Sequence, residues 1–168
     1  EKLKDFCKEN KIPCLGLSDT SNLFGALEFS ENISKVGTQP IIGTQIYFKF
    51  EDTTGLLPLI ALNQKGYKRI IELSSKSYLE NDALSDPHLD IRELLTKTDG
   101  VLLLSGTIQG LFGKLFEKGR LEEISKIYKD LSLILHDNFY LEIQRHGDQN
   151  ETAFEKFNLE QSSKNKIP

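Results

Sequence analysis

Four short segments carry the polar residues whose types and positions could do chemistry. Each segment adjoins or overlaps an apolar run that predicts a strand, and functional groups in parallel α/β proteins collect at the carboxyl ends of the strands. The candidates are Asp19, Thr20 and Asn22 in "LSDTSN", Thr44 and Gln45 in "GTQ", Ser105, Thr107 and Gln109 in "SGTIQG", and Glu142, Gln144, Arg145 and His146 in "YLEIQRHG". Together they predict a polar cluster with a single histidine.

Asp19 raises the question of what this cluster does, because a carboxylate at the end of a buried strand is a common metal ligand. A metal site that hydrolyses phosphate esters needs several His, Asp and Glu ligands. The chain has three histidines, and we expect His88, in a polar loop, and His136, at a helix end, to lie at the surface. His146 is the better candidate. These groups are too few for a tight polynuclear site, so Asp19 is either a ligand or the remnant of one.

The composition excludes several classes of protein. A hydrophobic content of 38% with 27% charged residues is typical of a globular protein, and the net charge of −4 lacks the basic footprint of a main DNA-binding surface. Cys7 and Cys14 fit neither a disulfide framework nor a zinc knuckle, which indicates reduced structural thiols in a cytoplasmic protein. No apolar stretch approaches the roughly 20 residues that cross a bilayer, so no membrane partner is expected.

Predicted helices and strands alternate along most of the chain. Helical spacing occurs in residues 1–10, 24–37, 65–79, 91–97, 111–119, 121–135 and 151–166, and strand-like runs occur in residues 12–17, 39–50, 56–63, 100–106 and 138–144. This order predicts the α/β class with parallel strands and crossover helices, in a sheet that is either open or closed. Because the chain starts inside a helix and stops after one, we expect a single partial domain over residues 1–168, marginally stable by itself.

Several of these segments resemble one family in order and spacing over nearly the whole chain. The segments are "LSDTSNLFGALEFSENISKVGTQPIIGTQIYF", "GYKRIIELSSKSYLE", "DGVLLLSG" and "FYLEIQRHG". They are similar to the PHP (polymerase and histidinol phosphatase) domain of the bacterial DNA polymerase III alpha subunit. The resemblance implies a distorted (β/α)7 TIM-like barrel, here lacking its first and last strands, with metal ligands at the carboxyl ends of its strands.

The resemblance also implies which positions hold metal in the family. Asp19 matches the family's aspartate, but Thr20 stands where a histidine ligand is usual, Gln45 replaces a glutamate, and Thr107 replaces a cysteine. Glu142, Arg145 and His146 are retained. Since amides and hydroxyls bind Zn²⁺ or Mn²⁺ poorly and cannot lower the pKa of a bound water, the resemblance predicts a vestigial site in which Asp19 and His146 are the remaining candidates for metal.

Three hypotheses follow from the resemblance. The first is a catalytically silent domain that acts in DNA replication as a structural and docking module, with the rest of the polymerase alpha subunit and the separate proofreading exonuclease subunit as partners, and with DNA contacted through other domains. It needs no cofactor in this segment, whereas the polymerase site elsewhere uses Mg²⁺. The second is an active phosphoesterase or proofreading exonuclease that uses Zn²⁺ or Mn²⁺. The third is a decayed gene fragment without function.

Overall fold

The computed structural model of the chain describes residues 2–82, 85–96 and 98–168. The elements in these ranges are α1 (Lys2–Glu9), β1 (Cys14–Thr20), α2 (Ala26–Ser34), β2 (Gln39–Phe50), β3 (Thr53–Ala61), α3 (Gln64–Leu79), β4 (Leu89–Asp90), the 3-10 helix η1 (Ile91–Leu95), β5 (Val101–Leu104), α4 (Leu111–Glu117), α5 (Leu121–Leu135), the 3-10 helix η2 (His136–Asn138), β6 (Phe139–Tyr140) and α6 (Glu151–Asn165). The described helices include none that is long and apolar enough to cross a membrane.

One mixed sheet joins all the strands in the described part of the chain. Its order is β1-β2-β3-β5-β6, and the short strand β4 pairs with β2 beyond the end of β1. β2 runs parallel to β1 and β4, and β5 runs parallel to β6, but β3 is antiparallel to both β2 and β5. The sheet is not closed, and the fold is mixed α/β.

The prediction of parallel strands throughout is therefore wrong for β3. Only Glu51 and Asp52 separate β2 from β3, and Glu51 has a φ of +52°. A two-residue connection can join antiparallel strands, whereas parallel strands need a crossover of a dozen or more residues. The tight turn thus reverses the chain and makes β2 and β3 a long hairpin.

The two faces of the hairpin differ in burial. Ile46, Phe48, Leu57 and Leu59 are fully buried and belong to a core cluster that includes apolar residues of α3, η1, α4 and α5. On the opposite face, Gln45 pairs with Pro58 and Tyr47 with Leu56, all only partly buried. We call this second side the open face; register extends it to Ser18 and Thr20 in β1, and to Leu104 and Tyr140 in β5 and β6.

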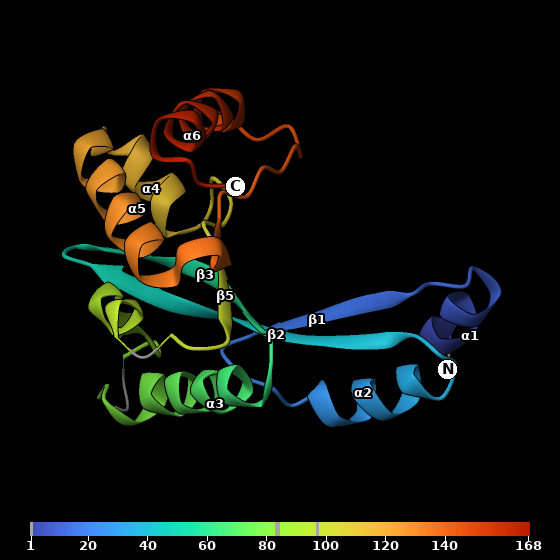
Figure 1. Cartoon of the computed structure of the whole chain (residues 1–168). Helices are drawn as coiled ribbons and strands as arrows, with labels where there is room; N and C mark the ends of the chain where they lie inside the picture. The colour runs from blue at the N-terminus through green and yellow to red at the C-terminus, as the bar shows by residue number, and fades with distance from the viewer. Residues whose placement is uncertain (1, 83–84, 97) are drawn as a thin grey trace.

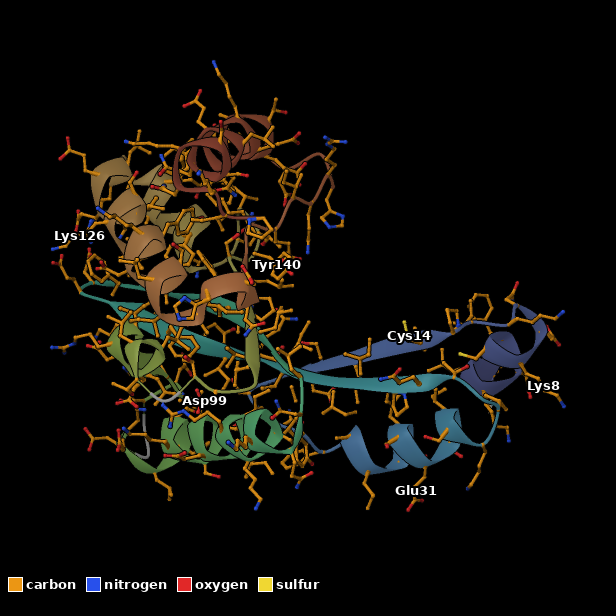
Figure 2. The ribbon with its side chains drawn as sticks, viewed as in Figure 1. Lys8, Cys14, Glu31, Asp99, Lys126 and Tyr140 are labelled. Atoms are coloured by element: carbon orange, nitrogen blue, oxygen red, sulfur yellow. The ribbon has the colours of Figure 1, made fainter. Side chains whose placement is uncertain are left out.

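Residues 2–42, containing α1, β1, α2 and the first part of β2, project from the rest of the molecule, and we call them the arm (Figure 1). We call residues 43–168 the body. Figure 2 shows Lys8, Cys14 and Glu31 along the arm, with Asp99, Lys126 and Tyr140 on the body. In the view of Figure 1, α3 is drawn below the β2–β3 hairpin and α4, α5 and α6 above it, and apolar residues of all four helices belong to the one core cluster.

The local sequence explains where several elements begin. Asn63 caps α3, because its side-chain oxygen accepts hydrogen bonds from the amides of Lys65 (2.9 Å) and Gly66 (3.1 Å). Asp90 caps η1 in the same way through the amide of Arg92. The predicted bounds of β2 and α5 are confirmed. β6 is shorter than predicted, since only Phe139 and Tyr140 pair with β5.

Candidate functional site

A pocket of about 240 Å³ lies on the open face where β2, β3 and β5 meet the segment after β6. Its polar lining consists of Ser18, Gln45, Thr107, Gln109, Glu142 and Gln144, and its apolar lining includes Leu56, Pro58, Ile60 and Leu104. Five of the candidates named from the sequence, Gln45, Thr107, Gln109, Glu142 and Gln144, are thus brought together from distant parts of the chain. Ser18 was missed in the sequence, although it lies two residues before Thr20 and strand alternation places both on one face.

Among the residues that the structure describes, Glu142 is the one carboxylate in the lining of this pocket. Its amide donates a hydrogen bond of 2.8 Å to Oγ of Ser105, a side chain that is itself fully buried. Gln144 donates from Nε2 to Oε1 of Glu142. Oε2 of Glu142 is buried and has no hydrogen-bond partner among the described residues. The side chain is therefore held in place through Oε1, whereas Oε2 accepts no hydrogen bond from the described residues.

Asp19 does not enter the pocket. It is the sixth residue of β1 rather than part of the turn after it, and its register partner is the fully buried Thr44. Its Oδ2 accepts a 3.3 Å hydrogen bond from the amide of Gly25, just before α2, and its carbonyl accepts one of 2.7 Å from Oγ1 of Thr44. Asp19 therefore helps to join β1 to the start of α2.

Thr20 lies beside Gln45 in the sheet, because the two residues are register partners on β1 and β2. Its side chain is exposed and lines a second pocket, whose lining includes neither Gln45 nor Glu142. The side chain of Thr107 accepts a hydrogen bond of 3.1 Å from the amide of Gln109, which forms a local turn before α4. Both predicted ligand positions thus carry hydroxyls that are placed on the open face.

Arg145 and His146 are organised around α6 instead. Arg145 is exposed and makes a two-pronged ion pair with Glu155, at 2.9 Å from Nε and 2.6 Å from Nη2. This ion pair lowers the pKa of Glu155 below its ordinary value and raises that of Arg145. The amides of His146 and Gly147 donate to Glu151, which lowers the pKa of that carboxyl. The segment therefore ties the region after β6 to the start of α6.

One contact connects His146 to the pocket. Its Nε2 lies 2.9 Å from Oε1 of Gln144, the same amide whose nitrogen binds Glu142. Glu142, Gln144 and His146 thus form a hydrogen-bonded chain, with the imidazole at its exposed end. His88 is partly buried in the second pocket, and His136 is exposed at the end of α5.

The donors in the first pocket do not fit a metal cluster. Within the described ranges, no group of three or more His, Cys, Asp or Glu side chains is placed to hold a metal ion. One carboxylate surrounded by amides and hydroxyls lacks the several charged or imidazole ligands that such ions require. These neutral groups can bind polar ligands and one another by hydrogen bonds.

Comparison with known proteins identifies the class. The model of the PHP domain family matches residues 1–146, so the chain belongs to the PHP domain family. The chain is also similar to the DNA polymerase III subunit alpha of Caulobacter vibrioides, at 34% identity over 168 residues, covering 92% of this chain and 14% of the relative. The same subunit of Rickettsia felis is 35% identical over 147 residues, covering 87% of this chain and 12% of the relative. The chain thus spans a small fraction of these curated relatives.

A solved structure supports the fold. A candidate metal-dependent phosphoesterase from Bifidobacterium adolescentis superimposes with a TM-score of 0.59 at 12% sequence identity, covering 99% of this chain and 78% of that chain. At this identity the likeness concerns the fold alone.

Proposed function

We propose that this chain acts as the N-terminal PHP domain of a DNA polymerase III alpha subunit and serves DNA replication as a structural and docking module without catalysis of its own. The observation that carries the proposal is the chemistry of the open face. Thr20, Gln45 and Thr107 occupy the positions where the family resemblance implies histidine, glutamate and cysteine ligands, and Asp19 is directed toward α2.

The arrangement favours hydrogen bonding over metal binding. Neutral hydroxyl and amide groups neither attract a divalent cation strongly nor lower the pKa of a bound water. The one carboxylate in the first pocket already accepts a hydrogen bond from Gln144, and His146 is bonded to the same amide. The predicted vestigial site is thus consistent with a network that stabilises the loop after β6.

The proposed partners are the remainder of the polymerase alpha subunit and the proofreading exonuclease subunit, in the cytoplasm, with DNA bound through other domains. In this proposal the open sheet is part of the distorted (β/α)7 barrel of the PHP type, and residues 1–168 form a single partial domain. The segment needs no cofactor, and Mg²⁺ belongs to the polymerase site elsewhere.

Metal content tests the proposal. The protein is loaded with Zn²⁺ or Mn²⁺, desalted and analysed by plasma mass spectrometry, and we expect far less than one ion per chain. The matched positive control is the triple variant Thr20→His, Gln45→Glu, Thr107→Cys, which restores the implied ligand types and should retain more metal. Near-stoichiometric metal in the unaltered chain would contradict the proposal.

One observation favours an active phosphoesterase or exonuclease as a second candidate. Oε2 of Glu142 is buried without a partner, and a carboxylate oxygen in that state is suited to a cation. In that case the unaltered chain should hydrolyse p-nitrophenyl phosphate or single-stranded DNA when Zn²⁺ or Mn²⁺ is added, and Glu142→Gln should abolish the activity. Absence of metal-dependent hydrolysis in both proteins would exclude this candidate.

A further inference from the structure

The second pocket on the open face has a volume of about 690 Å³ and a chemistry that the scaffold function does not use. It lies between the end of β1, the β2–β3 hairpin, the end of α3 and α4. We propose that this pocket binds a nucleoside monophosphate without a metal ion. The phosphate would be held by Lys114, His88 and Ser21, and the base would stack on Tyr47 and Tyr78.

Ser21 gives the first reason. Its side chain is 6% exposed, lines the pocket, and its Oγ has no hydrogen-bond partner among the described residues. The backbone holds it in this position: φ is +57°, the amide donates 2.7 Å to the carbonyl of Gln45, and the carbonyl accepts 3.1 Å from Oγ of Ser74. A buried hydroxyl without a partner costs free energy, and a ligand oxygen in the pocket would recover it.

Lys114 supplies a nitrogen donor, and His88 supplies a second one when its ring is in the imidazolium form. Nζ of Lys114 lies 2.9 Å from the carbonyl of Thr54, and no carboxylate of the described residues forms an ion pair with it within 4 Å. His88 is oriented by Nδ1, which lies 2.8 Å from the carbonyl of Asp86. The carbonyl can only accept, so Nδ1 carries a proton; Nε2 is left without a partner in this contact and can donate to a phosphate oxygen in the imidazolium form. An ammonium group with further proton donors is a common phosphate site in proteins.

Two tyrosines in the lining favour a nucleotide over inorganic phosphate as the ligand of this pocket. Tyr47, partly buried on β2, and Tyr78, exposed at the end of α3, both line the pocket. Stacking of a base on an aromatic ring stabilises nucleic-acid ligands, and the pocket volume lies within the range of small-molecule sites. Asp86 is the one carboxylate that the described residues contribute to the lining, and its exposed position lets it accept a hydrogen bond from a ribose hydroxyl.

The test is isothermal titration of the 168-residue chain with AMP, inorganic phosphate and adenosine, in the presence of EDTA. We expect AMP to bind more tightly than inorganic phosphate and more tightly than adenosine. Lys114→Ala should weaken AMP binding by about tenfold or more, as for a lost hydrogen bond to a charged group, and Ser21→Ala by about fivefold. Tyr78→Leu should weaken AMP and leave phosphate unchanged. Lys68→Ala, an exposed lysine on α3, is the matched control and should bind as the unaltered chain does.

Thermal melts establish that each variant is folded before its affinity is compared. The proposal is overturned if the unaltered chain binds neither AMP nor phosphate at millimolar concentration, if folded Lys114→Ala binds AMP as before, or if phosphate binds as tightly as AMP. Because EDTA removes divalent ions and the named residues are not the implied metal ligands, failure here would leave the scaffold proposal intact, and a metal found in the first pocket would leave this proposal intact.

Discussion

The arm and the body are held together by different interactions. Every buried member of the described core cluster comes from Ile46 or later in the chain, and β3 alternates between buried and partly buried residues from Thr53 to Ile60. β1, in contrast, has no buried residue, and the buried apolar residues of the arm are Cys7, Ala26 and Ile33. The arm therefore depends mainly on backbone pairing between β1 and β2, whereas the body gains stability from removing apolar surface from water.

Hydrogen exchange should show the largest difference between the two regions. Amides of β5 lie in the core of the body and should exchange only when the body unfolds, whereas amides of β1 should exchange through local opening of the arm. We expect protection factors at least about a hundredfold higher in β5 than in β1, measured by NMR or mass spectrometry. Equal protection in both strands would mean that arm and body unfold as one unit.

Replacing one leucine of the arm and one of the body by alanine compares how much each region's packing contributes to the free energy of unfolding. Leu59 is fully buried in β3, and Leu15 is partly buried in β1. Leu59→Ala should lower the free energy of unfolding by about 2–5 kcal/mol, because it leaves a cavity, and Leu15→Ala by less than about 1 kcal/mol. Urea denaturation of the two variants measures this, and similar losses would show that the arm is packed as well as the body.

Two glycines test how closely the backbones approach. A Cβ on Gly66 of α3 would lie 1.8 Å from the carbonyl oxygen of Gly100, whereas a Cβ on Gly16 of β1 would meet nothing within 4 Å. Gly66→Ala should therefore destabilise the protein by about 1–3 kcal/mol, and Gly16→Ala should be neutral or slightly stabilising. Thermal melts of both variants are the measurement; tolerance of alanine at position 66 would contradict the observed contact between α3 and the loop before β5.

The smallest effect is expected from the ion pairs that hold the β2–β3 turn to α5. Arg120 pairs with Glu51, Asp52 and Glu123, and its guanidinium lies 5.0 Å from the centre of the Phe50 ring. Hydrogen bonds from Lys118 and Thr53 lower the pKa of Asp52 below its ordinary 3.8, and those from Arg120 lower the pKa of Glu123 below 4.5.

The sign of the pH dependence follows from these shifts. A carboxyl whose pKa is lowered in the folded state stabilises the protein above its unfolded pKa, and this contribution is lost as the pH falls through the folded value. Arg120→Ala should therefore have a lower melting temperature than the unaltered protein at pH 7. The difference between the two melting temperatures should become smaller below pH 4.5. Circular dichroism melts from pH 7 to 3 test this, with Lys35→Ala, an exposed lysine of the arm, as the control. If the difference in melting temperature did not change with pH, the loss of stability would come from the contact of Arg120 with Phe50 and not from the ion pairs.

The sequence predicted individual elements better than their pairing. Residues 39–50 and 121–135 formed the strand and helix expected of them, because β-branched and aromatic runs and apolar spacing of 3.6 residues are local signals. The direction of β3 depended on whether the turn after Phe50 was two residues long, which the segment "EDTTG" leaves open. Asp19 was expected just after the strand predicted over residues 12–17 but lies within β1, since pairing with β2 continues to Thr20 and Gln45.

The sequence by itself determined the chemical nature of the candidate site: hydroxyls at Thr20 and Thr107 and an amide at Gln45 are neutral wherever the chain places them. Only the tertiary structure decided which groups meet. It turned Asp19 toward Gly25, joined His146 to Glu142 through Gln144, and placed Lys114 beside Thr54, a residue 60 positions earlier. The physical reason is that side-chain type is a local property, whereas the face on which a side chain lies depends on strand register and on packing between segments distant in sequence.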